Sequence, residues 1–200
     1  MWKAFLRRAL PGSDSTHPRP QAASTPPAAN EYQPGNHDAA ITPANARLHG
    51  GRGHLLLSRT PSPAFQLAAQ LIQEKVFVVV VTRFHPERVS SEHGIPRNVI
   101  IWLTTNPGAD HLTPSKPALV GDSLCRTISE NSKGVLVIHG FEYLTTTNDF
   151  PTALRVIEQL AEKASATGGR FVLTLDPRTL PERELALIEA FLDTIEEPAG

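Results

Sequence analysis

The sequence predicts an α/β domain over residues 50–197, in which helices cover both faces of a mainly parallel five-stranded sheet. Two observations lead to this prediction. Apolar runs of strand length alternate with segments of helical periodicity, which is the pattern of βαβ units. The run 76–81 is apolar throughout and mostly β-branched, as is typical of a strand buried on both faces of a parallel sheet. Right-handed crossovers then give a three-layer sandwich.

The residues ahead of this domain differ in composition. Residues 11–45 contain seven prolines and no Leu, Val, Phe, Trp or Met. Such a segment buries too little apolar surface to offset the entropy lost on ordering. We therefore expect residues 1–49 to form a disordered Pro-rich tail that acts as a tether.

Five strands and five helices are expected in the folded part. The strands are predicted at residues 54–58, 76–81, 98–104, 134–139 and 170–175. Ser62-Pro63 has the composition of a helix start, with Ser as N-cap and Pro in the first turn. The other helices are predicted at 85–93, at 119–131, at 149–166 with Gly168 at its end, and from a capping box at Thr179–Glu182 through Ile195. Residues 106–117 are expected to form a loop.

Composition excludes several classes of function. The formal net charge is -1, and no basic run steers the chain to nucleic acid or anionic lipid. The single cysteine, Cys125, allows no internal disulfide and no cysteine-based metal site. No segment reaches the roughly 20 apolar residues of a membrane span. These features predict a cytoplasmic protein.

The loop after the first strand argues against nucleotide chemistry. A phosphate-binding loop needs glycines so that its backbone N–H groups can surround the phosphates. Residues 58–63 (SRTPSP) contain no glycine and two prolines. The same loop lacks the acidic residues with which a phosphoacceptor receiver domain holds magnesium. Arg59 beside a helix N-terminus leaves room for a different mode of anion binding.

Two other catalytic readings are incomplete. Gly121–Leu124 spells GDSL, but the histidine base that such an esterase needs does not follow it in the required D-x-x-H element. Polar residues do follow several predicted strands, where parallel sheets bind ligands. They suggest either a metal-dependent hydrolase built on His85, His139 and Asp176, an anion pocket, or a solvated rim. The candidate ligand-binding residues are Arg59, Arg83, His85, His139, Glu142, Asp176 and Arg178. No residue is assigned as catalytic or metal-binding, and no cofactor is expected.

Several segments together resemble one family. They are Val81–Val89 (VTRFHPERV), Ile100–Thr104 (IIWLT), Val137–Leu144 (VIHGFEYL) followed by Asn148–Phe150, and Asp176–Leu180 (DPRTL) followed by Glu184-Leu185. The family is the domain of unknown function 835, common in archaea, and the resemblance runs from about Gly50 to Thr194. It implies a fold related to the RecA/KaiC-like ATPases without their phosphate-binding loop, often in a signal-transduction context. Where the family commonly has Asp, this chain has His139, which further disfavours ATP hydrolysis.

The sequence therefore predicts a non-catalytic signalling or protein-interaction module, a degenerate NTPase-like domain with a protein partner or a second copy of itself. The alternative is a nucleotide- or anion-binding sensor at the carboxyl edge of the sheet.

Overall fold

The computed structural model describes residues 43–106, 108 and 111–197. In this part of the chain one seven-stranded sheet has the order β4-β3-β2-β5-β6-β1-β7, and every neighbouring pair is parallel. The strands are β1 (Arg52–Leu57), β2 (Val78–Thr82), β3 (Ile100–Leu103), β4 (His111–Leu112), β5 (Val135–His139), β6 (Arg170–Leu175) and β7 (Asp193–Ile195).

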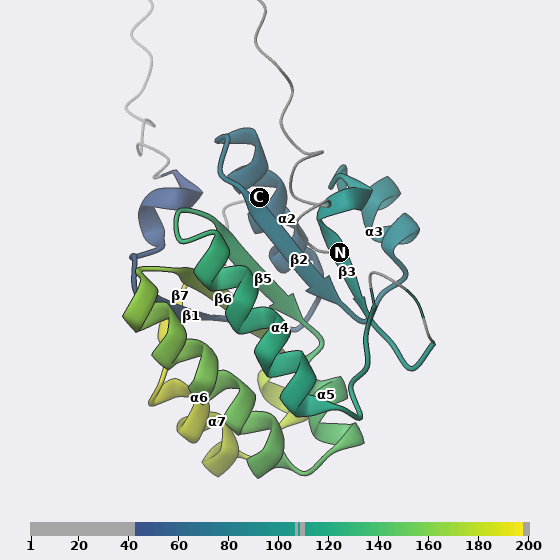
Figure 1. Cartoon of the computed structure of the whole chain (residues 1–200), viewed down its shortest axis with the longest axis vertical. Helices are drawn as coiled ribbons and strands as arrows, with labels where there is room; N and C mark the ends of the chain where they lie inside the picture. Colours follow the sequence, from purple (N-terminus) through teal and green to yellow (C-terminus); the bar gives the residue numbers. More distant parts are fainter. Residues whose placement is uncertain (1–42, 107, 109–110, 198–200) are drawn as a thin grey trace, which may run out of the picture. The chain divides into compact units, whose positions relative to one another are not determined.

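Helices cover both faces of the sheet. α4 and α6 lie side by side on the face turned to the viewer in Figure 1, and α2 lies on the other face. The elements are η1 (Ala44–Arg47), α2 (Ser62–Gln73), α3 (Pro86–His93), η2 (Arg97–Val99), α4 (Pro117–Glu130), α5 (Phe141–Thr147), α6 (Phe150–Thr167), η3 (Pro177–Thr179) and α7 (Glu182–Glu189).

The central strands are buried on both faces because their side chains alternate between two cores. Val78 and Val80 of β2 pack with α2, together with Val137 of β5. Val79 and Val81, which point to the opposite face, are also almost fully buried. The predicted α/β class, the parallel sheet and the helices on both faces of the sheet are thus confirmed.

The number of strands differs from the prediction. The five predicted strands correspond to β1, β2, β3, β5 and β6, but β4 and β7 add one strand at each edge. β4 lies within the predicted loop 106–117 and has two residues, too few to show a periodic pattern. β7 lies within the predicted last helix, which instead ends at Glu189.

The last helix ends at Glu189, and the residues that follow it lead into a strand. Ile188 and Leu192 are buried, whereas Phe191 is 44% exposed. Leu192 packs onto Gly53 of β1, where an added Cβ would lie 2.6 Å from a Leu192 methyl group. The chain therefore turns toward β1 and continues along it as β7.

Of the three predicted helix caps, the structure confirms the one at Gly168 and places the other two at different residues. Gly168 ends α6 with a φ of 72°, in the left-handed region that favours glycine. α2 begins at Ser62, so Pro61 takes the N-cap position predicted for Ser62. The capping box at Thr179 does not form, because the Thr179 hydroxyl donates to the Asp176 carbonyl and Pro181 is the N-cap of α7.

The folded part begins ahead of the predicted boundary at residue 50. Ala44 and Leu48 are only 2% and 4% exposed and belong to the core beside α2. The Glu74 carboxylate accepts hydrogen bonds from the backbone N–H groups of Ala44 (2.7 Å) and Asn45 (2.9 Å). Two isolated apolar side chains next to a Pro-rich segment did not predict this part of the core. The rest of the predicted tail, residues 1–42, lies outside the described residues.

The Glu74 carboxylate acts as a cap for η1 supplied from another element. We expect Glu74→Ala to lower the free energy of unfolding by about 1 kcal/mol, the usual cost of losing a capping side chain. Chemical denaturation measures this loss, and limited proteolysis should show faster cleavage within residues 43–49. Unchanged cleavage would mean that the carboxylate does not hold the segment.

Candidate functional site

A small pocket of about 90 Å³ lies at the carboxyl ends of β1, β5 and β6. Four of the seven candidate residues line it, namely Arg59, His139, Glu142 and Asp176, and Arg178 binds Asp176 beside it. The other lining residues are Ser58, Thr60, Pro61, Thr174 and Leu175. Because carboxyl ends of parallel strands meet at one edge, residues far apart in sequence converge here.

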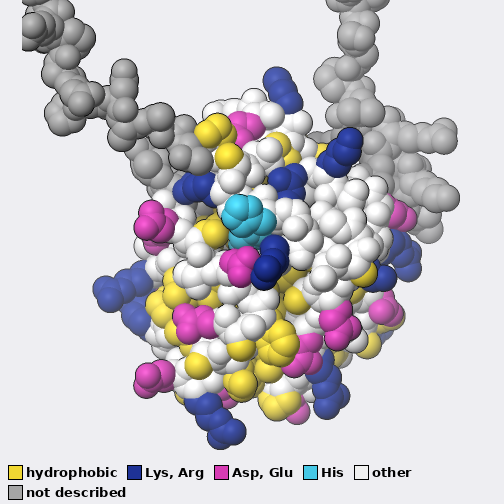
Figure 2. All heavy atoms as spheres, turned by 90° about the vertical axis from the view of Figure 1, so that its left-hand side faces the viewer, with side chains coloured by type: hydrophobic (Ala, Val, Ile, Leu, Met, Phe, Trp, Pro, Cys, Tyr) yellow, Lys and Arg dark blue, Asp and Glu magenta, His cyan; other side chains and the backbone are white. Residues whose placement is uncertain are grey.

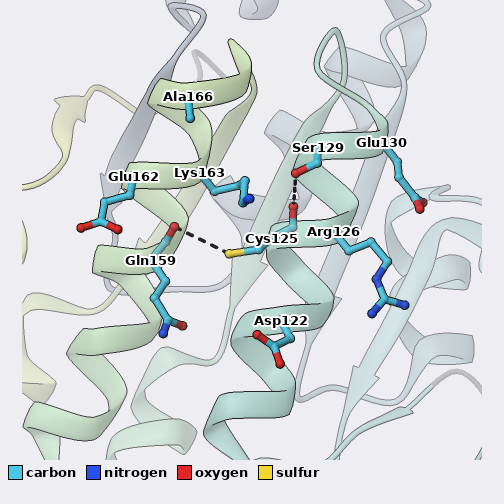
Figure 3. Close-up of a pocket in the computed structure, with 9 residues that line it drawn as sticks. All are labelled: Asp122, Cys125, Arg126, Ser129, Glu130, Gln159, Glu162, Lys163 and Ala166. Atoms are coloured by element: carbon cyan, nitrogen blue, oxygen red, sulfur yellow. Dashed lines mark hydrogen bonds between the residues drawn. The ribbon is translucent and has the colours of Figure 1, made fainter.

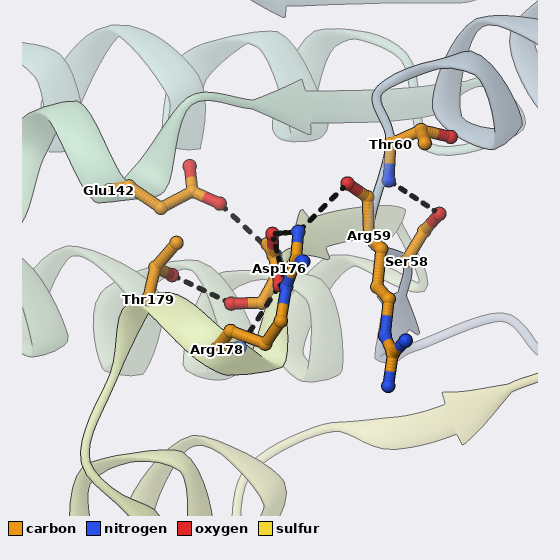
Figure 4. A network of polar contacts seen from close by, with 7 residues as sticks. All are labelled: Ser58, Arg59, Thr60, Glu142, Asp176, Arg178 and Thr179. Carbon is orange, nitrogen blue, oxygen red and sulfur yellow. Dashed lines mark hydrogen bonds and ion pairs between the residues drawn. The ribbon is translucent and has the colours of Figure 1, made fainter.

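Protein groups at this pocket are joined by a network of polar contacts (Figure 4). Arg178 makes a bidentate ion pair with Asp176, with Nη2 to Oδ2 at 2.6 Å and Nε to Oδ1 at 2.9 Å. The Glu142 carboxylate accepts the Asp176 backbone N–H at 3.2 Å. Arg178 Nη2 also donates to the Arg59 carbonyl at 3.4 Å. The loop after β6 is thereby connected to α5 and to the loop after β1.

The ion pair shifts the pKa values of both of its members. The hydrogen bond from the Arg178 side chain, assisted by the Arg178 backbone N–H, lowers the pKa of Asp176 to about 2. The same contact raises the pKa of Arg178. Asp176 is thus ionised at neutral pH, and its charge is already matched by a guanidinium group.

The loop Ser58–Pro61 offers few free donors. The Ser58 N–H donates to the Leu175 carbonyl at 3.0 Å, and the Thr60 N–H donates to the Ser58 hydroxyl at 3.3 Å. Pro61 has no N–H. A loop that surrounds a phosphate needs several N–H groups directed at the same point.

His139 lies at the wall of the pocket in an apolar setting. Its ring is 4.9 Å from that of Phe84 and 5.4 Å from that of Phe65. Burial, and secondarily the positive charge of Arg83, lowers its pKa to about 4. The ring is therefore neutral at pH 7, and its Nδ1 is 3.0 Å from the hydroxyl of Thr82.

The Thr82 hydroxyl is a site residue that sequence reasoning missed. It is fully buried at the end of β2 and accepts the Phe84 N–H at 3.1 Å. A hydroxyl has one hydrogen and two lone pairs, so after accepting the Phe84 N–H it can still form a hydrogen bond with His139 Nδ1. Its position one residue before Arg83, at the end of a buried strand, was the available signal.

Arg83 and His85 do not join the pocket. The Arg83 guanidinium lies over the Tyr143 ring, 5.2 Å from its centroid. His85 packs edge-on against Trp102, and its Nδ1 accepts the Glu87 N–H at the start of α3. Within the described ranges no three His, Cys, Asp or Glu side chains are placed to hold a metal ion. The residues of the predicted hydrolase site, His85, His139 and Asp176, are thus not gathered around one point.

A second hollow lies between α4 and α6 (Figure 3). It is an open groove of about 760 Å³ with mixed charges, lined by Asp122, Cys125, Arg126, Ser129, Glu130, Gln159, Glu162, Lys163 and Ala166. Burial raises the pKa of the Cys125 thiol, which donates to the Gln159 carbonyl, so it is not an activated nucleophile. The GDSL tetrapeptide lies within α4 rather than in a sharp turn at a strand end.

Comparisons with known proteins agree with the resemblance seen in the sequence. A family model described as "Protein of unknown function (DUF835)" matches residues 57–192. Among solved structures, the RadB recombinase is similar over 74% of this chain and 75% of its own, with 18% sequence identity and a TM-score of 0.47. At that level the likeness says nothing about activity. A search of curated proteins finds no match. No helix in the described part of the chain is long and apolar enough to cross a membrane.

Proposed function

The chain belongs to the DUF835 family of proteins of unknown function. We propose that it is a non-catalytic protein-interaction module that acts in signalling. The observation that carries the proposal concerns the carboxyl edge of the sheet, where open parallel sheets bind ligands. In this chain the side chains of Glu142, Asp176 and Arg178 fill that edge with contacts to other protein groups.

The size of the pocket supports this proposal. Sites for small molecules and cofactors usually enclose about 300–1,000 Å³, whereas this pocket has about 90 Å³. A nucleotide would therefore require the loops Ser58–Pro61 and Asp176–Thr179 to separate. The Arg178 side chain, oriented by its ion pair with Asp176 in the same loop, donates across to the Arg59 carbonyl of the other loop.

The charges of the pocket support it as well. The formal charges at the pocket sum to zero, because Arg59 and Arg178 are balanced by Glu142 and Asp176. Arg178 is paired with Asp176, whereas the Arg59 guanidinium points away from that pair (Figure 4). A site for phosphate groups needs an excess of positive charge or of N–H donors. The sequence alternative of an anion sensor at this edge would rely on the Arg59 guanidinium alone, because Arg178 is already bound to Asp176.

Thermal unfolding of the full chain tests the absence of nucleotide binding. We expect no change in Tm with about 1 mM Mg·ATP, Mg·GTP or inorganic phosphate. The test is sensitive, because a ligand present at 100 times its Kd would stabilise the folded protein by about 2.7 kcal/mol. Arg178→Ala is the control variant. A shift seen in the unchanged protein and lost in Arg178→Ala would contradict the proposal and favour the anion sensor.

Site-specific photo-cross-linking in the native host tests the interaction itself. A cross-linkable residue is placed at Leu119, at Leu187 or at Phe191, the large hydrophobic residues that the described structure leaves exposed. A control is placed at Thr60 beside the pocket. We expect one discrete protein adduct from at least one exposed position and none from Thr60. Adducts from no position would contradict the proposal.

A further inference from the structure

Resting on the proposed function, we infer that one edge of the domain binds an extended peptide segment that is both basic and apolar. The surface, here named the α7–β7 edge, consists of α7 (Glu182–Glu189), Phe191, β7 (Asp193–Ile195), Glu196 and Glu197. The segment would add to the sheet as a further strand beside β7. Three independent features of this edge lead to the inference.

The first feature is a strand with a free side. β7 is the last strand of the described sheet and pairs only with β1, through His54↔Asp193, Leu55↔Thr194 and Leu56↔Ile195. Its outer N–H and C=O groups face away from the sheet. Such an edge is a template for main-chain pairing with another segment.

The second feature is exposed apolar surface on the helix and turn that lead into that strand. Leu187 and Phe191 are 42% and 44% exposed, and they lie four residues apart. Their neighbours Ile188 and Leu192 are 0% and 5% exposed, so the backbone that presents the two side chains is anchored in the core. Figure 2 shows the side of the molecule that includes this edge, with hydrophobic side chains gathered in its lower half and both acidic and basic side chains around them.

The third feature is charge. Residues 182–197 hold six acidic residues and one arginine, whereas the rest of the chain holds 18 basic and 14 acidic residues. The acidic residues are Glu182, Glu184, Glu189, Asp193, Glu196 and Glu197. The ion pair nearest the strand, Arg52 with Asp193, is long at 3.6 Å and exposed. Local charge of one sign raises the concentration of oppositely charged partners near the surface.

The same charges decide between two occupants. A second copy pairing β7 with β7 would bring the acidic residues of both copies together, and like charges across a strand pair are destabilising. A segment that alternates Lys or Arg with Val, Ile or Leu satisfies all three features. Its main chain pairs with β7, its apolar side chains contact Leu187 and Phe191, and its cations meet the carboxylates.

Fluorescence anisotropy with the full chain tests this inference. The probe is a labelled ten-residue peptide of alternating lysine and valine, and the control peptides are an alternating glutamate–valine peptide and an N-methylated lysine–valine peptide that cannot donate to β7. We expect saturable binding of the first peptide alone, weakened at least tenfold by Leu187→Ser/Phe191→Ser and unchanged by Leu119→Ser. Binding should weaken as salt is raised from about 50 to 500 mM.

Several results would overturn the inference. They are no saturable binding of the lysine–valine peptide, equal binding of the N-methylated peptide, and binding that the double variant leaves unchanged. Sedimentation velocity is run on the same sample, and a dimer that Phe191→Ser dissociates would assign the edge to a second copy instead. If the lysine–valine peptide does not bind but a protein cross-links at Leu119, this inference fails while the proposed function stands.

Discussion

Replacing Phe65 by alanine is expected to lower the free energy of unfolding by about 3–5 kcal/mol, the usual cost of removing a large buried aromatic side chain. Phe65 lies in the first turn of α2 and is 0% exposed. Its ring contacts three others, those of His93 (4.7 Å), His139 (5.4 Å) and Phe84 (6.2 Å). It therefore links α2 and α3 with the carboxyl ends of β2 and β5, directly under the pocket.

Urea denaturation of the full chain measures this loss. Phe191→Ala is the matched control, because the same atoms are removed from a side chain that is 44% exposed; we expect a cost below about 1 kcal/mol there. Equal effects of the two substitutions would show that Phe65 does not pack as described. A loss at Phe65 with an unchanged denaturant slope would indicate that the fold persists.

Acidification is expected to destabilise the domain through His139. The pKa of His139 is about 4 in the folded protein and 6.5 in its ordinary state, so the unfolded chain binds this proton more readily. The contribution to stability is complete above pH 6.5 and is lost as the pH falls from 6.5 toward 4. One pKa unit corresponds to 1.36 kcal/mol, so the loss is of the order of 3 kcal/mol.

Comparison with His139→Gln isolates this contribution, because the glutamine amide can hydrogen-bond to Thr82 but does not titrate in this range. The difference in unfolding free energy between pH 7 and pH 4 should be smaller in the variant by about 2–3 kcal/mol. The account of His139 would be contradicted if His139→Gln were as acid-sensitive as the unchanged protein.

His54 adds to the acid sensitivity of every variant. It is fully buried, its Nε2 accepts the His49 N–H at 3.0 Å, and its Nδ1 is 3.3 Å from the Phe171 carbonyl. An amide can only donate and a carbonyl can only accept, so Nδ1 has the proton and the ring is neutral. Burial lowers its pKa. Since this residue is unchanged in both proteins, its contribution cancels in the comparison.

The strands that the sequence revealed are those with long apolar runs. Val78–Val81 of β2 and Phe171–Leu175 of β6 are buried, and burial on both faces requires the largely apolar composition from which these two strands were predicted. β4 and β7 pair along one side only and have two and three residues. Their place depends on the neighbouring strand rather than on their own composition, so their sequence shows no pattern.

The candidate site was predictable to the extent that strand ends define an edge. His139, Glu142 and Asp176 follow β5 and β6, which are neighbours, and they line one pocket with Arg59. Arg83 and His85 follow β2 at the same edge, but their side chains contact Tyr143 and Trp102 instead. Side-chain direction beyond a strand end depends on the next helix, α3 or α5, and no spacing rule in the sequence specifies it.

The resemblance to the domain of unknown function 835 was confirmed, while the function remains a proposal. The central claim of the proposed function is that Asp176, Arg178 and Glu142 fill the carboxyl edge of the sheet, so that no nucleotide binds there. The most direct test is the amide NMR spectrum of the isotope-labelled full chain with and without about 1 mM Mg·ATP. We predict that the resonances of residues 58–60, 139–142 and 176–179 do not move. Saturable shifts of these resonances, absent in Arg178→Ala, would contradict the claim and identify the edge as a nucleotide site.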